Sequence, residues 1–210
     1  MARSGPKRGD SRGETRGAIL DATVGSLAEL GFSGTSARAV AQRAGVAPGG
    51  VFYHFGSMDD LLTEVFATCL DRRIARLRAA VDVPRSGLPT AFAQAVRDEF
   101  AHPESRALLE LVVGAIDSPL LAARVREGTD QAFAFTREVV ELLLADSPMA
   151  GLLPLDLVAQ VAASAFFGLG VMALVGADVD VDGMTDLVGV LLMFLGGDWP
   201  VPTGGQDPPD

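Results

Sequence analysis

The sequence is poor in the side chains on which most catalytic sites and extracellular folds depend. Its one cysteine, Cys69, cannot form a disulfide within the chain, which fits a protein of the reducing cytoplasm. There are two histidines, no glycine-rich phosphate loop and no cluster of metal-ligand residues, so we expect no enzyme, no cofactor and no metal site. Residues 1–14 are charged and lack an apolar segment, so we also expect no signal peptide.

The alternation of polar and apolar residues that marks a strand is missing as well. Apolar residues instead recur at helical spacing between prolines and glycines. With 210 residues, 49% hydrophobic and 21% charged, the chain can form one or two folded domains. The predicted fold is therefore all-α. After the N-terminal region, helices are expected over residues 58–81, 90–101, 104–117, 120–145, 155–175 and 184–195.

The first helix is predicted to begin near Arg12, because Ser11 and Glu14 have the spacing of a capping box. It should end at Gly31, and Phe32 is expected in the core of a three-helix unit. The residues predicted to face the core from this helix are Ile19, Thr23, Leu27 and Leu30.

The net charge of −10 is unevenly distributed along the chain. Residues 1–56 carry seven basic and four acidic groups, so they have a balance of +3 and the remainder carries −13. A basic end joined to an acidic body favours nucleic-acid binding at the basic end, although an acidic body also keeps a protein soluble. Residues 1–13 are interpreted as a flexible basic arm, which either contacts DNA or is merely a solvated tail.

The stretch 36–62 has the layout of a helix-turn-helix. Ser36 is a good N-cap, Gly45 stands where a helix needs a left-handed residue, and Pro48 suits the first position of the next helix. In this motif the second helix enters the DNA major groove.

Gly49 and Gly50 are unfavourable inside that second helix, since each costs ~1 kcal/mol relative to alanine. A backbone without side chains can approach bases and phosphates closely, so we interpret the glycines as functional. The alternative is that Pro48–Gly50 simply forms a loop.

From Arg16 to Leu62 the chain resembles the DNA-binding domain of the TetR (tetracycline-repressor) family of transcriptional regulators. The resemblance is carried by LGFSGTS, then VAQRAGVAPGGVFYHF, then SMDDLL. It implies an all-helical dimer with an N-terminal helix-turn-helix domain and a C-terminal ligand-binding and dimerisation domain. The predicted parts are a flexible arm (1–13), a helix-turn-helix domain (14–57), a helical body whose first helix is a connector (58–197) and a disordered tail (198–210).

The resemblance places Arg38 where it can reach a base or a phosphate, and Val51 and Phe55 are expected to face inward. Phe52 and Met58 depart from the family, which usually has tyrosine and lysine at these positions, so a hydroxyl donor and a positive charge for phosphate are absent. Ser57 and Asp60 should form a capping box instead. The predicted DNA-contacting residues are Ser36, Arg38, Gln42, Arg43, Pro48, Gly49, Gly50, Phe52, Tyr53, His54 and Ser57.

Residues 157–177 contain no charged side chain and are long enough to span a membrane. Asp156 and Asp178 flank them where basic residues would be usual, so we interpret the segment as a helix buried on nearly all sides. Together with residues 187–195 it is predicted to form a four-helix interface with a second chain. The predicted interface residues are Val161, Ala165, Leu169, Leu187, Leu191 and Phe194.

A pocket for an apolar ligand is predicted within the helical body, although any single aromatic residue there can equally be core. The candidate pocket residues are Phe100, His102, Phe133, Phe166, Phe167 and Met172. The favoured function is a cytoplasmic homodimeric repressor that a small apolar ligand releases from a palindromic double-stranded operator. The alternatives are an activator or ligand-independent regulator, an enzyme, and a regulator anchored in a membrane.

Overall fold

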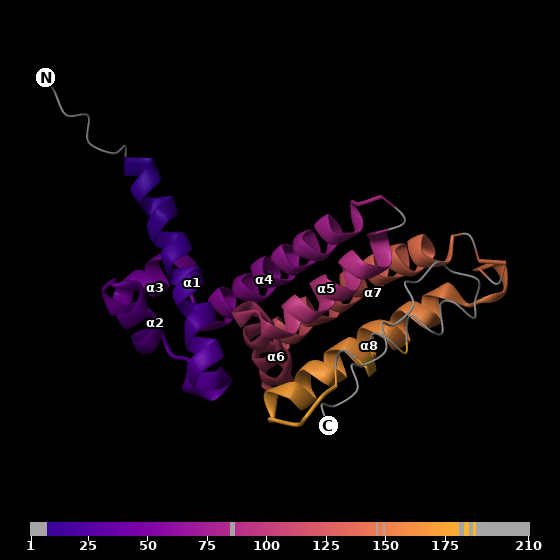
Figure 1. Cartoon of the computed structure of the whole chain (residues 1–210). Helices are drawn as coiled ribbons and strands as arrows, with labels where there is room; N and C mark the ends of the chain where they lie inside the picture. The colour runs from indigo at the N-terminus through magenta and orange to yellow at the C-terminus, as the bar shows by residue number, and fades with distance from the viewer. Residues whose placement is uncertain are drawn as a thin grey trace, which may run out of the picture. The chain divides into compact units, whose positions relative to one another are not determined.

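The computed structural model describes residues 8–84, 87–145, 147–148, 150–180, 183–184 and 187. Within them the chain forms eight α-helices and no strand, which confirms the predicted all-α fold (Figure 1). Short 3₁₀ turns follow α6 and precede α8. The helices are α1 (Arg8–Gly34), α2 (Ala37–Ala44), α3 (Pro48–Phe55), α4 (Met58–Val81), α5 (Leu88–Ala101), α6 (Pro103–Gly114), α7 (Pro119–Leu144) and α8 (Leu155–Leu174).

The chain divides into two compact units, and both α4 and α7 contribute to each of them. Unit 1 consists of the residues up to Arg72 together with His102–Thr129, and unit 2 consists of Arg73–Ala101 and the residues from Asp130 onward. The division between the two units therefore lies inside α4, after Arg72. The sequence predicted a domain boundary at the start of this helix, between residues 57 and 58. The reason is that Leu61 and Val65, in the first half of α4, are fully buried in unit 1.

The N-terminal part differs from the prediction in one boundary. α1 begins at Arg8, four residues before the expected start, so residues 8–13 are helical and do not belong to a flexible arm. Ser11 therefore lies inside the helix and is not its cap. Residues 1–7, the predicted tail 198–210 and residues 188–195 of the last predicted helix lie outside the described residues.

The core of unit 1 confirms most of the predicted inner face of α1. Ile19, Thr23 and Leu27 are completely buried. Leu30 was wrongly placed in this core, because its side chain is 55% exposed. It immediately precedes Gly31, whose φ of 72° breaks the helical path and ends the inward-facing surface of α1.

Phe32 was predicted in the core of the three-helix unit, but its side chain is only half-buried and packs on α6. A Cβ at Gly114 of α6 would collide with the ring of Phe32, so only glycine allows this close approach. The backbone N–H of Phe32 donates to Glu110 Oε2 at 2.8 Å. Gly31 and Gly114 thus allow α1 and α6 to be joined by packing and by a charge-assisted hydrogen bond.

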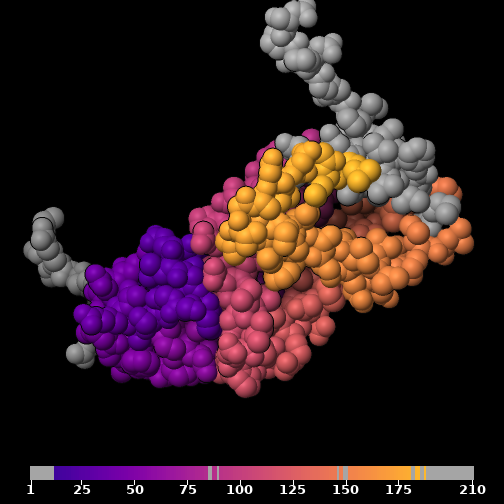
Figure 2. Space-filling model, turned by 90° about the horizontal axis from the view of Figure 1, so that it is seen from below, coloured from indigo at the N-terminus to yellow at the C-terminus, as the bar shows by residue number. Residues whose placement is uncertain are grey.

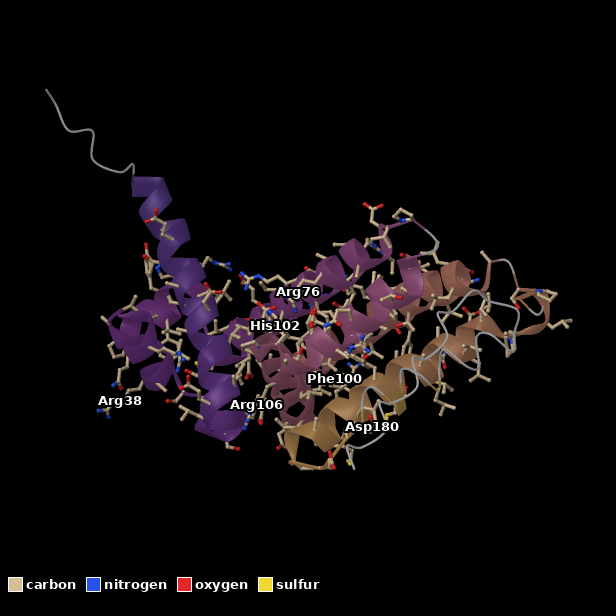
Figure 3. All side chains as sticks on the ribbon, in the orientation of Figure 1. Arg38, Arg76, Phe100, His102, Arg106 and Asp180 are labelled. Carbon is tan, nitrogen blue, oxygen red and sulfur yellow. The ribbon has the colours of Figure 1, made fainter. Side chains whose placement is uncertain are left out.

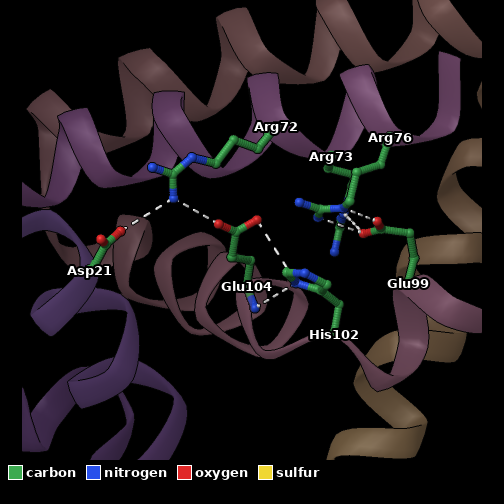
Figure 4. A network of polar contacts seen from close by, with 7 residues as sticks. All are labelled: Asp21, Arg72, Arg73, Arg76, Glu99, His102 and Glu104. Atoms are coloured by element: carbon green, nitrogen blue, oxygen red, sulfur yellow. Dashed lines mark hydrogen bonds and ion pairs between the residues drawn. The ribbon is translucent and has the colours of Figure 1, made fainter. Parts of the chain in front are cut away.

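Unit 2 encloses a carboxylate shared by two arginines of α4. Glu99 on α5 is 3% exposed and accepts from Arg73 Nε at 3.1 Å and from Arg76 Nε at 2.6 Å (Figure 4). Burial by itself would raise the pKa of Glu99, but the guanidinium groups of Arg76 and Arg73 outweigh it and hold that pKa below its usual value.

Unit 1 has a separate ion-pair cluster, which is centred on Arg72 of α4. Arg72 Nη1 donates to Glu104 on α6 at 2.9 Å and to Asp21 on α1 at 3.4 Å (Figure 4). Cys69, one turn earlier, is fully buried, as expected of a core cysteine.

The helix α8 was predicted to be buried on nearly all sides with the help of a second chain, and within one chain it is largely exposed. Of its residues only Ala159 is buried, and the side chains of Leu157 and Val161 are 56% and 61% exposed. Figure 2 shows the surface of α8, coloured orange to yellow, in unit 2. The helix is long and apolar enough to cross a membrane by length and composition, which is weak support for a membrane span because core helices pass the same test.

Candidate nucleic-acid interface

The turn between α2 and α3 is held by the caps that the sequence predicted. Ser36 Oγ accepts from the backbone N–H of Ala39 at 3.3 Å, and Gly45 adopts a left-handed conformation with φ of 68°. The backbone N–H of Val46 donates to the carbonyl of Ala41 at 3.0 Å, which completes the C-cap of α2. Ser36 thus caps the start of α2, and Gly45 and Val46 close its end before α3 begins.

The α3 helix presents one apolar face to unit 1 and the opposite face to solvent. Val51 is fully buried and Phe55 is 8% exposed, as predicted. Phe52 and Tyr53 are 48% and 69% exposed, which is high for aromatic side chains. Pro48 occupies the first turn of this helix, so a real helix forms here and not the alternative loop.

Gly49 has no role in the packing of the free protein. A Cβ at this position would have no heavy atom within 4 Å, whereas one at Gly50 would touch Val46 at an ordinary 3.6 Å. The backbone at both positions has no positive φ. The fold therefore tolerates a side chain at Gly49, and the packing of the free protein does not require glycine there.

Replacing Gly49 by alanine is expected to stabilise the protein and to weaken DNA binding. The gain should be up to ~1 kcal/mol in the free energy of unfolding, since alanine favours the helix and meets open space. Thermal unfolding and a gel-shift titration of the same sample measure the two effects. If both stability and DNA affinity rise, the glycine is not kept for close approach to DNA.

The two polar side chains predicted on the outer face of α2 are both exposed. Arg38 and Gln42 lie four residues apart and point away from the buried Val40. Figure 3 shows Arg38 projecting outward from unit 1. Among the described residues Arg38 has no hydrogen-bond or ion-pair partner, so its guanidinium is available to a ligand.

Arg43 differs, because its charge is already paired. Its guanidinium donates to Glu29 of α1 through two hydrogen bonds, of 2.7 and 2.5 Å. A Cβ at Gly25 would collide with the Arg43 side chain, so this glycine allows the arginine to lie across α1. The hydrogen bond from Arg43 holds the pKa of Glu29 below its usual value. Arg43 therefore orients α2 on α1.

The remaining predicted residues border α3 and the start of α4. The rings of Tyr53 and His54 meet edge to face, with centroids 5.2 Å apart. The Ser57 hydroxyl donates to the Asp60 carboxylate at 2.6 Å and accepts from the Asp60 backbone N–H at 3.0 Å, so the predicted capping interaction is confirmed.

Two arginines of α1 that are not among the predicted DNA contacts lie over aromatic rings of α3. Arg12 lies over the ring of Tyr53, 5.2 Å from its centroid, and Arg16 lies over the ring of Phe55 at 4.6 Å. Arg16 also forms a two-pronged ion pair with Glu64 of α4. Their spacing of four residues on one helix face is the sequence signal that could have grouped them.

Of the predicted pocket residues, the structure brings two together. The rings of Phe100 and Phe166 lie 4.9 Å apart, and Arg73 lies over Phe166 at 5.5 Å. Phe167 and Met172 are 37% and 48% exposed, and Phe133 is half-buried.

His102 belongs to unit 1 and has a structural task there. Its Nδ1 accepts from the backbone N–H of Glu104 at 3.3 Å and caps α6. Of the predicted interface residues, Val161, Ala165 and Leu187 are exposed and Leu169 is half-buried, while Leu191 and Phe194 lie outside the described residues. In the described part of the chain no three His, Cys, Asp or Glu side chains are grouped to hold a metal ion.

An all-helical chain with an N-terminal helix-turn-helix, whose second helix exposes glycine and aromatic residues, has the architecture of a helix-turn-helix regulator. Residues 19–65 match the family model described as bacterial regulatory proteins of the tetR family. This match confirms the resemblance of residues 16–62 to the DNA-binding domain of that family. The curated relatives that it matches are named as regulators of transcription.

Three known proteins show how far the similarity extends. An uncharacterised HTH-type transcriptional regulator of Mycobacterium tuberculosis is 32% identical over 118 residues, which are 55% of this chain and 58% of the relative. The HTH-type transcriptional repressor KstR2 of the same species is 34% identical over 67 residues, 32% of this chain and 34% of that protein. The solved structure of a TetR transcription regulator from Haloarcula marismortui has a TM-score of 0.72 at 15% identity, over 87% of this chain and 98% of the other. The last similarity concerns the fold alone.

Proposed function

We propose that this protein is a homodimeric repressor of transcription that binds a palindromic operator and is released from it by a small apolar ligand. The observation that carries the proposal is the outer face of the helix-turn-helix. There Arg38 has no partner among the described residues, Tyr53 is 69% exposed and Gly49 leaves the backbone bare. An unpaired guanidinium and an open helix start are what base and phosphate recognition require. KstR2, which matches part of the chain, is named as a repressor, and this favours repression over activation.

Dimer formation through α8 is the second part of the proposal. Leu157, Val161 and Ala165 follow one another at helical spacing, and all three are exposed. This twenty-residue apolar helix is largely exposed within one chain, so it needs a partner, and a second copy supplies the same apolar stripe. Two copies also place two recognition helices in register with half-sites ~34–36 Å apart, or a multiple of that distance.

The effector is proposed to bind in unit 2, beside the contacting rings of Phe100 and Phe166. Aromatic rings favour an apolar or aromatic small molecule. A ligand that shifts α4, which belongs to both units, would change the presentation of the DNA-binding helices. A coupling of ~1–3 kcal/mol is typical and corresponds to a 5- to 150-fold change in DNA affinity.

The decisive experiment is selection of bound sequences from a random duplex pool, with sedimentation equilibrium of the same sample. We expect an inverted repeat with half-sites about one helical turn or a multiple apart, and a dimer in solution. A monomer that enriches no sequence would contradict the proposal. A single unrepeated site would contradict the dimeric mode of binding.

A membrane-anchored regulator is the second candidate, and the exposed apolar surface of α8 is the observation in its favour. We propose a cytoplasmic protein instead, because Asp156 and Asp178 flank the helix where basic anchors would be expected. Fractionation after lysis separates the two. Recovery with the lipid pellet, released only by detergent, would favour the membrane.

A further inference from the structure

We propose that Arg12 is a phosphate anchor, which extends the DNA-binding surface from α3 onto α1. This inference rests on the proposed function, because it concerns the same face of the protein. The guanidinium carbon of Arg12 lies 5.2 Å from the centroid of the Tyr53 ring. Both side chains are exposed, and no described carboxylate pairs with Arg12. The stacked guanidinium thus keeps its charge and its hydrogen-bond donors open to an anion.

Arg16, one turn further along α1, makes the same kind of stacking contact in a purely structural role. Arg16 is stacked on Phe55 in the same manner, but Phe55 is 8% exposed and Glu64 neutralises the guanidinium. Arg16 therefore fastens α1 to α3 and α4. Arg12 lies one helical turn, about 6 Å, further toward the N-terminus of α1. It repeats the stacking on an exposed ring, and no carboxylate in the described part of the chain pairs with it.

The distance from Tyr53 suits a phosphate at the edge of the major groove. The groove is about 12 Å wide, so its walls lie about 6 Å from its centre, and the phosphates line these walls. If Tyr53 enters the groove, a cation 5.2 Å from its ring is close enough to reach a phosphate of the groove wall. A guanidinium there can hold a phosphate through two hydrogen bonds.

Arg12 also compensates for the two phosphate-binding groups that the sequence lacks relative to the family. Phe52 lacks a hydroxyl and Met58 lacks a charge at positions where the family usually offers a phosphate a donor. The structure brings a cation to the same surface from α1. Because the ring of Tyr53 restricts the long side chain before DNA arrives, less conformational entropy is lost on binding. The positive charge is therefore supplied by α1, and the Tyr53 ring already orients the side chain that carries it.

The test is the salt dependence of DNA binding by Arg12→Ala. The probe is a duplex of about 30 base pairs, recovered by selection with the wild-type protein, and salt is varied from about 0.1 to 1 M. Each lost phosphate contact lowers the slope of log K against log salt by about 0.9, so a dimer should lose about 1.8. The variant should then bind about 60-fold more weakly at 0.1 M salt and equally near 1 M. Its melting temperature should stay unchanged, because the side chain is exposed.

Arg106→Ala is the matched control. Arg106 is an exposed arginine on α6 with no partner among the described residues, and its loss changes the net charge equally (Figure 3). It should leave the slope at the wild-type value.

An Arg12→Ala slope equal to that of the wild type would overturn the inference while leaving the proposed function intact. Equal losses in Arg12→Ala and Arg106→Ala would overturn it too, because they indicate general electrostatics. A wild-type protein that binds no duplex would overturn the proposed function, and the inference with it.

Discussion

Replacing Glu99 by glutamine is expected to lower the free energy of unfolding by about 3 kcal/mol, a large share of the 5–15 kcal/mol typical of folded domains. Glu99 is 3% exposed and is the shared acceptor of Arg73 and Arg76. Glutamine has almost the same shape but no charge, so two guanidinium groups lose the anion that compensates them. Because Arg76 is 33% exposed it can turn partly toward water, so the expected loss is at the low end for a buried pair. Urea unfolding followed by far-ultraviolet circular dichroism measures the difference.

The matched control is Glu138→Gln, which removes the partner of another α4 arginine. Glu138 accepts from Arg78 at 2.6 Å, but both side chains are more than half exposed. Exposed pairs contribute at most about 1 kcal/mol, so this variant should be close to the wild type. If both variants lower the free energy of unfolding by the same amount, the buried ion pairs of Glu99 contribute no more to stability than the exposed pair of Glu138.

The contribution of Glu99 should also depend on pH. Its pKa in the folded protein lies below the ordinary value of 4.5, so the folded state favours the charged form. The stabilisation is therefore complete well above pH 4.5 and is lost as the pH falls through the lowered pKa. The difference between wild type and Glu99→Gln should narrow below about pH 4.5, where denaturation curves at stepped pH would reveal it. A gap that stays constant through acid would contradict this assignment.

Arg38→Ala is expected to weaken operator binding by about 1–3 kcal/mol at each half-site and to relax the choice of one base pair. The side chain projects outward from α2 and has no partner among the described residues, so it is free to bind guanine through two hydrogen bonds. Repeating the selection with the variant reads the base preference, and a gel-shift titration reads the affinity. Because the side chain is exposed, the stability of the protein should not change.

Arg43→Ala is the natural comparison, since it removes the same charge from the same helix. Arg43 is engaged by Glu29, so its loss should cost less affinity and should leave the base preference unchanged. Arg38→Lys keeps the charge but not the planar fork, and it should lose specificity more than affinity. The role proposed for Arg38 would be wrong if Arg38→Ala bound the selected duplex as the wild type does, or weakened binding to all sequences equally.

Local chemistry in the sequence determined the elements of this protein. Ser36, Gly45 and Pro48 act on backbone groups within a few residues, so their capping roles could be predicted without knowing the fold. The bounds of α4 were predicted at Met58 and Val81 for the same reason, because a capping serine precedes the helix and a proline-containing break follows it. Val51 and Phe55 were predicted to face inward because helical spacing alone sets the direction of a side chain.

Only the tertiary structure decided which helix each side chain meets. Phe32 packs on Gly114, Arg43 pairs with Glu29, Arg12 stacks on Tyr53, and none of these partners is encoded by local spacing. The direction of a side chain around its own helix is fixed by helical periodicity. Its partner depends on how helices that are distant in the sequence pack together. The exposure of α8 within one chain was likewise decided by the tertiary structure. An apolar pattern indicates that a helix will be covered, but it does not show whether the same chain or a second chain covers it.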